Sequence, residues 1–131
     1  MRWVRDESGS ATVEFVLWLP AFVALLSLIA DVSLIFNGQA QVTRVVQDAN
    51  RMASIGRLEA LSDVETYISQ QLTRFEPNLS VTSSVDADNV LTSVVSVPAA
   101  NMQAIGWLSV LTGSTVTVRA QQFIERGESL S

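Results

Sequence analysis

A long apolar run near the N-terminus constrains this chain more than any other feature. Residues 13–36 read VEFVLWLPAFVALLSLIADVSLIF. The positions that are not plainly apolar are Glu14, Pro20, Ser27, Asp31 and Ser33. As a helix with a rise of about 1.5 Å per residue, the run would be about 36 Å long, enough to cross a hydrocarbon layer of about 30 Å. Because a chain of 131 residues has too little protein to surround such a helix, the run predicts one transmembrane helix.

A cleavable secretory signal is the alternative interpretation of this run. Such a signal would begin with Arg2 and Arg5 and end at the small residues Gly38 and Ala40. The apolar region of an ordinary signal covers only about 7–15 residues, so we expect the helix to remain in the mature protein. Arginines flank the run about equally on both sides, so their distribution does not predict its orientation.

Two carboxylates and one proline interrupt the run. Glu14 and Asp31 lie about 26 Å apart along a helix, which predicts that they sit near opposite membrane interfaces. Asp31 is expected to reach water or lipid headgroups, and Glu14 sits at a helix start, where the helix dipole favours a negative charge. Pro20 cannot donate to the helical hydrogen-bond ladder, which predicts a kink near residues 16–20.

Composition excludes several classes of function. The formal charge is −5, the wrong sign for a surface that follows nucleic-acid phosphates. The chain has no cysteine and no histidine, so thiolate metal sites, thiol nucleophiles and the commonest general base are absent. Asp86 and Asp88 could imitate a catalytic or calcium-binding pair, but their short polar segment is more typical of a solvated turn. We expect no catalytic residue, no cofactor, no metal and no enzyme activity.

The start of the apolar run carries a recognisable pattern, Gly9-Ser10-Ala11-Thr12-Val13-Glu14-Phe15. It resembles the prepilin peptidase site of type IV pilins and pseudopilins, in which the leader is cut after the glycine and the apolar segment is retained. The resemblance implies cleavage between Gly9 and Ser10, a leader of residues 1–9 and a transmembrane helix of residues 10–36.

Glu14, Phe15 and the early Pro20 make the pattern similar to one branch of that superfamily, the TadE-like (TadE/TadF) minor pilins and pseudopilins of the tight-adherence (Tad/Flp) pilus system. The resemblance implies a part in pilus assembly for adhesion or secretion. The implied partners are a prepilin peptidase, other minor pilins, inner-membrane platform proteins and lipid. The implied location is the bacterial inner membrane, spanned once, with residues 37–131 on the periplasmic side and entry into the pilus left open.

Cleavage would give Glu14 a counter-ion. The new ammonium of Ser10 would lie one helical turn before the carboxylate, and pairing lowers the cost of holding either charge in an apolar phase. The amine of the same chain and that of a neighbouring subunit both remain possible partners, so Glu14 and Phe15 are the candidate assembly residues. The alternatives are a single-span anchored binding protein outside any pilus system and a secreted binding domain that starts near Gln41.

Residues 37–131 predict a small α+β head. Apolar residues at mixed three- and four-residue spacing over 39–58 predict that the first helix continues as an amphipathic helix, with a weak point at Gly38 and a stop at Gly56. The apolar positions are Val42, Val45, Val46, Ala49, Met52, Ala53 and Ile55. The polar face is assigned to Gln41, Arg44, Gln47, Asp48, Asn50, Arg51 and Arg57.

Short elements follow this helix. Ser62 and Glu65 have the spacing of a capping box, which predicts a second helix that runs to Phe75 before Pro77. Alternating residues predict a hairpin over 79–85 and 90–97 and a last strand over 115–124, and residues 98–111 predict a short helix closed by Gly113. One face of the antiparallel sheet is expected to pack on the emerging half of the long helix.

Overall fold

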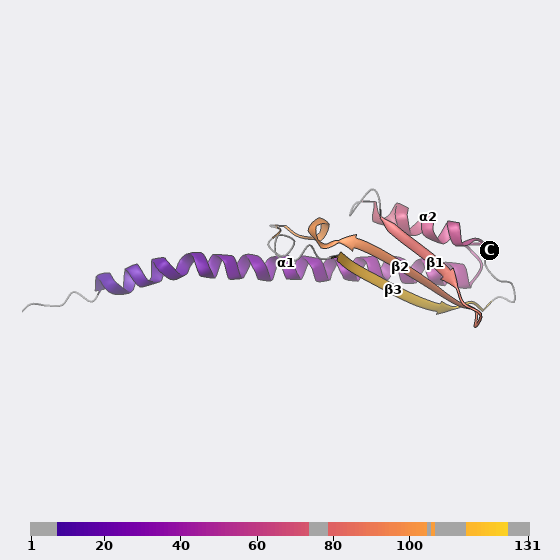
Figure 1. Ribbon diagram of the computed structural model, residues 1–131, viewed down its shortest axis with the longest axis horizontal. Coiled ribbons are helices and arrows are strands. Elements are labelled where there is room, and N and C mark those ends of the chain that lie inside the picture. Colours follow the sequence, from indigo (N-terminus) through magenta and orange to yellow (C-terminus); the bar gives the residue numbers. More distant parts are fainter. Residues whose placement is uncertain (1–7, 74–78, 105, 107–114, 126–131) are drawn as a thin grey trace, which may run out of the picture.

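The computed structural model of the chain describes residues 8–73, 79–104, 106 and 115–125. Its elements are helix α1 (Ser8–Ser54), helix α2 (Leu61–Leu72), strands β1 (Ser80–Val85) and β2 (Val90–Pro98), the 3-10 turn η1 (Ala99–Met102) and strand β3 (Thr115–Phe123). Figure 1 shows α1 as a long stalk, with α2 and the sheet gathered along its C-terminal part. The α+β fold predicted from the sequence is confirmed.

Helix α1 is a single element of 47 residues, about 70 Å long at 1.5 Å per residue. It continues without a break through Gly38, the predicted weak point. Gly38 is buried, and a Cβ atom at this position would lie 2.7 Å from the Sδ of Met102. The missing side chain therefore lets η1 approach the stalk closely.

Gly56 ends α1 as predicted. Its φ of 84° lies in the left-handed region, which glycine adopts without a steric penalty. The amide of Gly56 donates to the carbonyl of Ala53 at 3.1 Å, and that of Arg57 donates to Met52 at 2.8 Å. These two bonds form a Schellman motif, which satisfies carbonyls at the helix end and turns the chain back toward α2.

The sheet is antiparallel, with the strand order β1-β2-β3. Val95 of the central strand lies opposite Val81 of β1 and Val118 of β3, which confirms the predicted hairpin and last strand. The hairpin turns at residues 86–89, where Asn89 has a φ of 57° and its amide donates to the carbonyl of Asp86 at 3.0 Å. Asparagine tolerates this left-handed conformation better than most residues.

One face of the sheet packs on α1 and α2, as predicted. The buried apolar row of α1 has the i, i+4, i+7, i+11 spacing of one helix face. It comprises Val42, Val46, Ala49 and Ala53. The buried residues opposite it are Val64, Ile68 and Leu72 of α2, with Leu91, Val95, Val97 and Val118 of the sheet. The head therefore has one core, and α1 forms one wall of it.

The polar residue Asn50 lies inside this core, so its assignment to the wet face is wrong. Its Oδ1 accepts the hydroxyl of Ser93 at 2.6 Å, and its Nδ2 donates to the carbonyl of Ala120 at 3.1 Å. Ser93 also shares a hydrogen bond of 3.0 Å with the hydroxyl of Ser83. Burial of Asn50 is tolerated because these partners replace its hydrogen bonds to water.

Ile55 differs from its prediction in the opposite direction. It was assigned to the apolar face of the helix, but its side chain is 55% exposed.

The start of α2 differs in detail from the predicted capping box. The helix begins at Leu61, so Asp63 rather than Glu65 occupies its third position. The Oδ2 of Asp63 accepts the amide of Ala60 at 3.2 Å, whereas the Oε1 of Glu65 accepts the amide of Ser83 in β1 at 2.8 Å. Helix α2 ends at Leu72, before the predicted end, and Phe75 and Pro77 lie outside the described residues.

Of the predicted helix over residues 98–111, the described residues form only a short 3-10 helix. Residues 99–102 form one 3-10 turn, and Gln103 is already extended, with φ −97° and ψ 156°. Pro98 is the last residue of β2 and also the N-cap of this 3-10 turn. Gly113, the predicted stop, lies outside the described residues.

Candidate functional site

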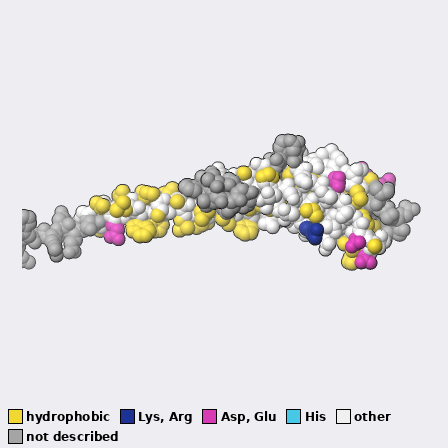
Figure 2. All heavy atoms as spheres, in the orientation of Figure 1, with side chains coloured by type: hydrophobic (Ala, Val, Ile, Leu, Met, Phe, Trp, Pro, Cys, Tyr) yellow, Lys and Arg dark blue, Asp and Glu magenta, His cyan; other side chains and the backbone are white. Residues whose placement is uncertain are grey.

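The N-terminal half of α1 is an apolar surface with almost nothing packed on it. One helix of the described region is long and apolar enough to cross a membrane, with a mean hydropathy of 2.3 over a window of which 6% is buried. Figure 2 shows the same segment as a yellow stalk that leads away from the head. The exposed side chains include Leu17, Phe22, Leu26, Ile29 and Phe36. Such a surface requires lipid or other apolar helices around it.

Glu14 interrupts this surface near its outer end. Its side chain is exposed and lines a shallow hollow together with Ala11, Phe15, Trp18 and Phe22. These positions follow each other at three- and four-residue steps, so they share one face of the helix. Figure 2 shows an acidic patch within the yellow stalk. The arrangement places a carboxylate beside three aromatic rings that are more than half exposed.

No basic residue lies between Arg5 and Arg44 in the sequence, so the helix around Glu14 offers no cationic side chain. The positions one turn away are Ser10, Ala11, Leu17 and Trp18. A carboxylate in an apolar phase costs about 2.5–3.5 kcal/mol without a partner. Within the described residues the helix around Glu14 therefore supplies no counter-ion, which leaves a backbone terminus, Arg2 or Arg5, a lipid headgroup or another chain as its source.

Gly9 and Ser10 occupy the first turn of α1, and Gly9 is exposed. Ser10 precedes Glu14 by four residues, which puts the two backbone positions on the same side of the helix about 6 Å apart along its axis. An amine at position 10 would therefore lie within reach of the carboxylate. All the sequence-predicted site residues are thus neighbours on one short stretch of helix.

Pro20 is exposed and lies inside α1, whose assignment continues on both sides of it. Figure 1 shows the helix changing direction gently in its N-terminal third. The kink at Pro20 stays a prediction.

Asp31 does not reach water or headgroups as predicted, because it is fully buried. Its Oδ1 accepts the backbone amide of Ala104 at 3.2 Å, in the segment that follows η1. The carboxylate therefore holds the head against the stalk. Sequence reasoning missed this because the partner is a backbone amide 73 positions away. Asn50 could have been suspected, because it falls in phase with the apolar row of α1.

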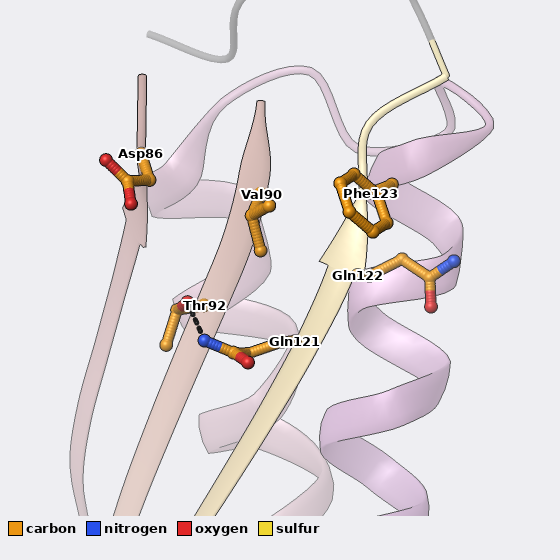
Figure 3. Close-up of a pocket in the computed structure, with 6 residues that line it drawn as sticks. All are labelled: Asp86, Val90, Thr92, Gln121, Gln122 and Phe123. Atoms are coloured by element: carbon orange, nitrogen blue, oxygen red, sulfur yellow. Dashed lines mark hydrogen bonds between the residues drawn. The ribbon is translucent and has the colours of Figure 1, made fainter. Parts of the chain in front are cut away.

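The far end of the sheet carries a second hollow, lined by Asp86, Val90, Thr92, Gln121, Gln122 and Phe123. In Figure 3, Gln121 reaches across to Thr92, to which its amide donates at 3.2 Å, while Gln122 points away from that pair. The carboxylate of Asp86 accepts the amide of Ala87 at 2.7 Å, as expected for a solvated turn. Within the described ranges, no three acidic side chains gather where they could hold a metal ion.

Comparison with known protein families finds a match for one segment of the chain. Residues 9–51 match the family model of TadE-like proteins, a span that begins at the predicted cleavage glycine and covers most of α1. The resemblance seen in the sequence is confirmed over that span. No curated protein and no solved structure matches the chain.

Proposed function

From the premise that residues 9–51 are TadE-like, we propose that the chain takes part in assembling a Tad-type pilus as a minor pilin or pseudopilin. It acts as an assembly component and not as an enzyme. The observation that carries the proposal is Glu14, an exposed carboxylate at the start of an exposed apolar helix with no cationic side chain near it in sequence.

Processing supplies the missing charge. A prepilin peptidase adds water across the amide bond between Gly9 and Ser10, which leaves a carboxylate on Gly9 and a free ammonium on Ser10. This amine lies one turn before Glu14, and the two charges neutralise each other within one chain or between neighbouring chains. Pairing between chains would define how far one subunit is displaced along the next.

Lateral contacts complete the assembly. Phe15, Trp18 and Phe22 lie on the same face as Glu14 and are 62%, 59% and 55% exposed. Packed against the apolar helix of another subunit, these rings would exchange lipid contacts for protein contacts, while the head selects which partners come together. A prepilin peptidase cuts the leader on the cytoplasmic side, so a helix that crosses the inner membrane once would put the head in the periplasm.

The mature N-terminus of the protein purified from its native membrane tests the proposal. Mass spectrometry is expected to find a chain that starts at Ser10. An intact start at Met1 would instead favour a single-span anchored binding protein, and a start near Gln41 would favour a secreted domain. Either of these results would overturn the pilin assignment. Gly9→Leu is expected to block processing, and a normally shortened product in that variant would remove the peptidase from the proposal.

The variant Glu14→Gln removes the charge but keeps the shape of the side chain. We expect it to be inserted and cleaved normally, while assembly of the pilus falls by about tenfold or more, equivalent to about 1.4 kcal/mol of lost pairing. Val13→Ala is the matched control at the adjacent exposed position. Equal piliation by Glu14→Gln and the control would contradict the role of the carboxylate.

A further inference from the structure

The two edge strands of the sheet differ in what covers them. The order β1-β2-β3 leaves β1 and β3 as the edges within the described residues. Helix α2 covers the β1 edge, where the carboxylate of Glu65 accepts the outward-pointing amide of Ser83 at 2.8 Å. An edge covered in this way cannot accept another strand at that point. Among the residues that the structure describes, no side chain caps the middle of the β3 edge in this way.

The register shows which groups of β3 face outward. The amide of Ser83 points away from β2, so Ser93 directs its backbone groups toward β3, where Ala120 lies opposite. Because backbone direction alternates along a strand, Arg119 and Gln121 direct their N–H and C=O groups to the open edge. Phe123 has the same parity, and its carbonyl accepts the hydroxyl of Ser54 in α1 at 2.8 Å. That bond confirms the alternation.

A groove runs between this edge and α1. On the helix side it is lined by Arg44, Gln47, Asp48 and Arg51, and on the strand side by residues 119–122. The four helix residues are all exposed and lie on one face. An added strand lies about 4.8 Å from its neighbour, so a segment in this groove would contact the outward groups of β3 and the helix face together.

The groove is positively charged on a chain whose overall charge is −5. Arg44, Arg51 and Arg119 line it, and Asp48 is its single carboxylate. The Oδ2 of Asp48 already accepts the hydroxyl of Tyr67 in α2 at 3.0 Å. Three arginines against one carboxylate give this lining a net charge of +2, which favours an occupant that carries carboxylates.

We propose that the groove between β3 and α1 binds an extended, acidic segment of another protein, which adds to the sheet as a fourth strand beside β3. Backbone hydrogen bonds to Arg119 and Gln121 supply affinity, and carboxylates of the segment pair with the arginines. A second copy of this chain fits poorly, because β1, β2 and β3 contain no Asp or Glu. This inference does not depend on the role of Glu14.

Binding of a synthetic strand to the full chain in detergent micelles tests the inference. The probe is a fluorescent nine-residue peptide of alternating glutamate and valine, followed by anisotropy. We expect saturable binding that weakens as salt is added, because the charges are exposed. The same peptide with lysine in place of glutamate is expected not to bind. A version with methylated backbone nitrogens is expected to lose most of its affinity, because it cannot donate to the carbonyls of β3.

Charge reversal in the groove provides the matched variants. The double change Arg44→Glu and Arg51→Glu is expected to lower the affinity by about tenfold or more. Arg57→Glu is the control, because Arg57 is exposed but lies outside the groove. N-terminal processing at Ser10 should be unchanged in both variants, which separates this test from that of the proposed function.

The inference would be overturned by the absence of saturable binding, by equal binding of the methylated peptide, or by an equal loss of affinity in the Arg57→Glu control. Dimers of the chain that compete with the peptide and disappear on Arg44→Glu and Arg51→Glu would assign the groove to self-association and would also overturn it.

Discussion

Helix α1 contains two halves that share one backbone and differ in what surrounds them. From Ala11 to Phe22 every described side chain is exposed, and nearly all are apolar around the whole circumference. From Val42 to Ala53 the apolar residues gather on one side and are buried or half-buried against the head. The difference shows how the pattern of apolar residues in a helix specifies what surrounds it. Uniform apolarity calls for lipid or other apolar helices all round, whereas a single apolar stripe calls for a protein core on one side.

The junction between the halves is polar and small. Asp31 accepts the amide of Ala104, and Gly38 has no side chain where Met102 approaches. Met102 of η1 and Ala104 after it thus contact the stalk about one turn and about three turns, respectively, before the buried apolar row begins at Val42. Head and stalk are therefore held together at this point, before the core itself starts.

The largest expected difference between the two halves of α1 is in their response to the same introduced charge. Val46→Asp puts a carboxylate at a fully buried position, where an unpaired charge costs several kcal/mol, enough to unfold a domain of ordinary stability. Val16→Asp puts it at a position that is 58% exposed, where it costs about 2.5–3.5 kcal/mol in lipid and touches no core. Calorimetry in micelles should show a lost head transition only for Val46→Asp, and membrane fractionation a loss of insertion only for Val16→Asp.

If Val16→Asp lowered the melting temperature of the head as much as Val46→Asp, the two halves would not be independent. If the Val16→Asp variant were inserted into membranes normally, lipid would not be what surrounds the N-terminal half of α1.

A smaller difference in stability is expected between two variants in the C-terminal half of α1. Asn50→Leu removes the acceptor of the Ser93 hydroxyl and the amide donor to Ala120, and should destabilise the head by about 1–3 kcal/mol. Gln47→Leu, one turn earlier on the exposed face, should stay within about 0.5 kcal/mol. Thermal unfolding of both variants measures the difference. Equal melting temperatures would show that the buried amide is not important for stability.

The smallest effect concerns the contact between α1 and α2 outside the core. The hydrogen bond from Tyr67 to Asp48 raises the pKa of Tyr67 above 10.0, with further contributions from burial and the negative charge of Asp48. Since the neutral phenol is favoured in the fold, this contribution to stability is fully present below pH 10 and lost as the pH rises through the higher value. Tyr67 is the only tyrosine, so its absorbance titration is unambiguous.

Asp48→Asn provides the control for this titration. It is expected to lower the pKa of Tyr67 toward the ordinary value, and an unchanged titration would show that Asp48 does not cause the shift.

Much of the fold could be predicted because its signals are local. The apolar run, the stop at Gly56 and the alternation of 80–85, 90–98 and 115–123 each reflect neighbours in sequence. The errors at three polar residues have a common cause. Asp31, Asn50 and Glu65 all have partners on distant elements, and no spacing rule reveals such a partner. For the same reason the candidate assembly residues Gly9, Ser10 and Glu14 could be named in advance, whereas the groove at β3 could not.

By itself the amino-acid order determined the stalk, because uniform apolarity, the helical rise and a carboxylate placed four residues after Ser10 are properties of one continuous segment. Only the tertiary structure decided which polar groups are buried and which strand edge stays open. Those outcomes depend on how a helix lies across a sheet, and hydrogen bonds between elements far apart in the chain select that placement.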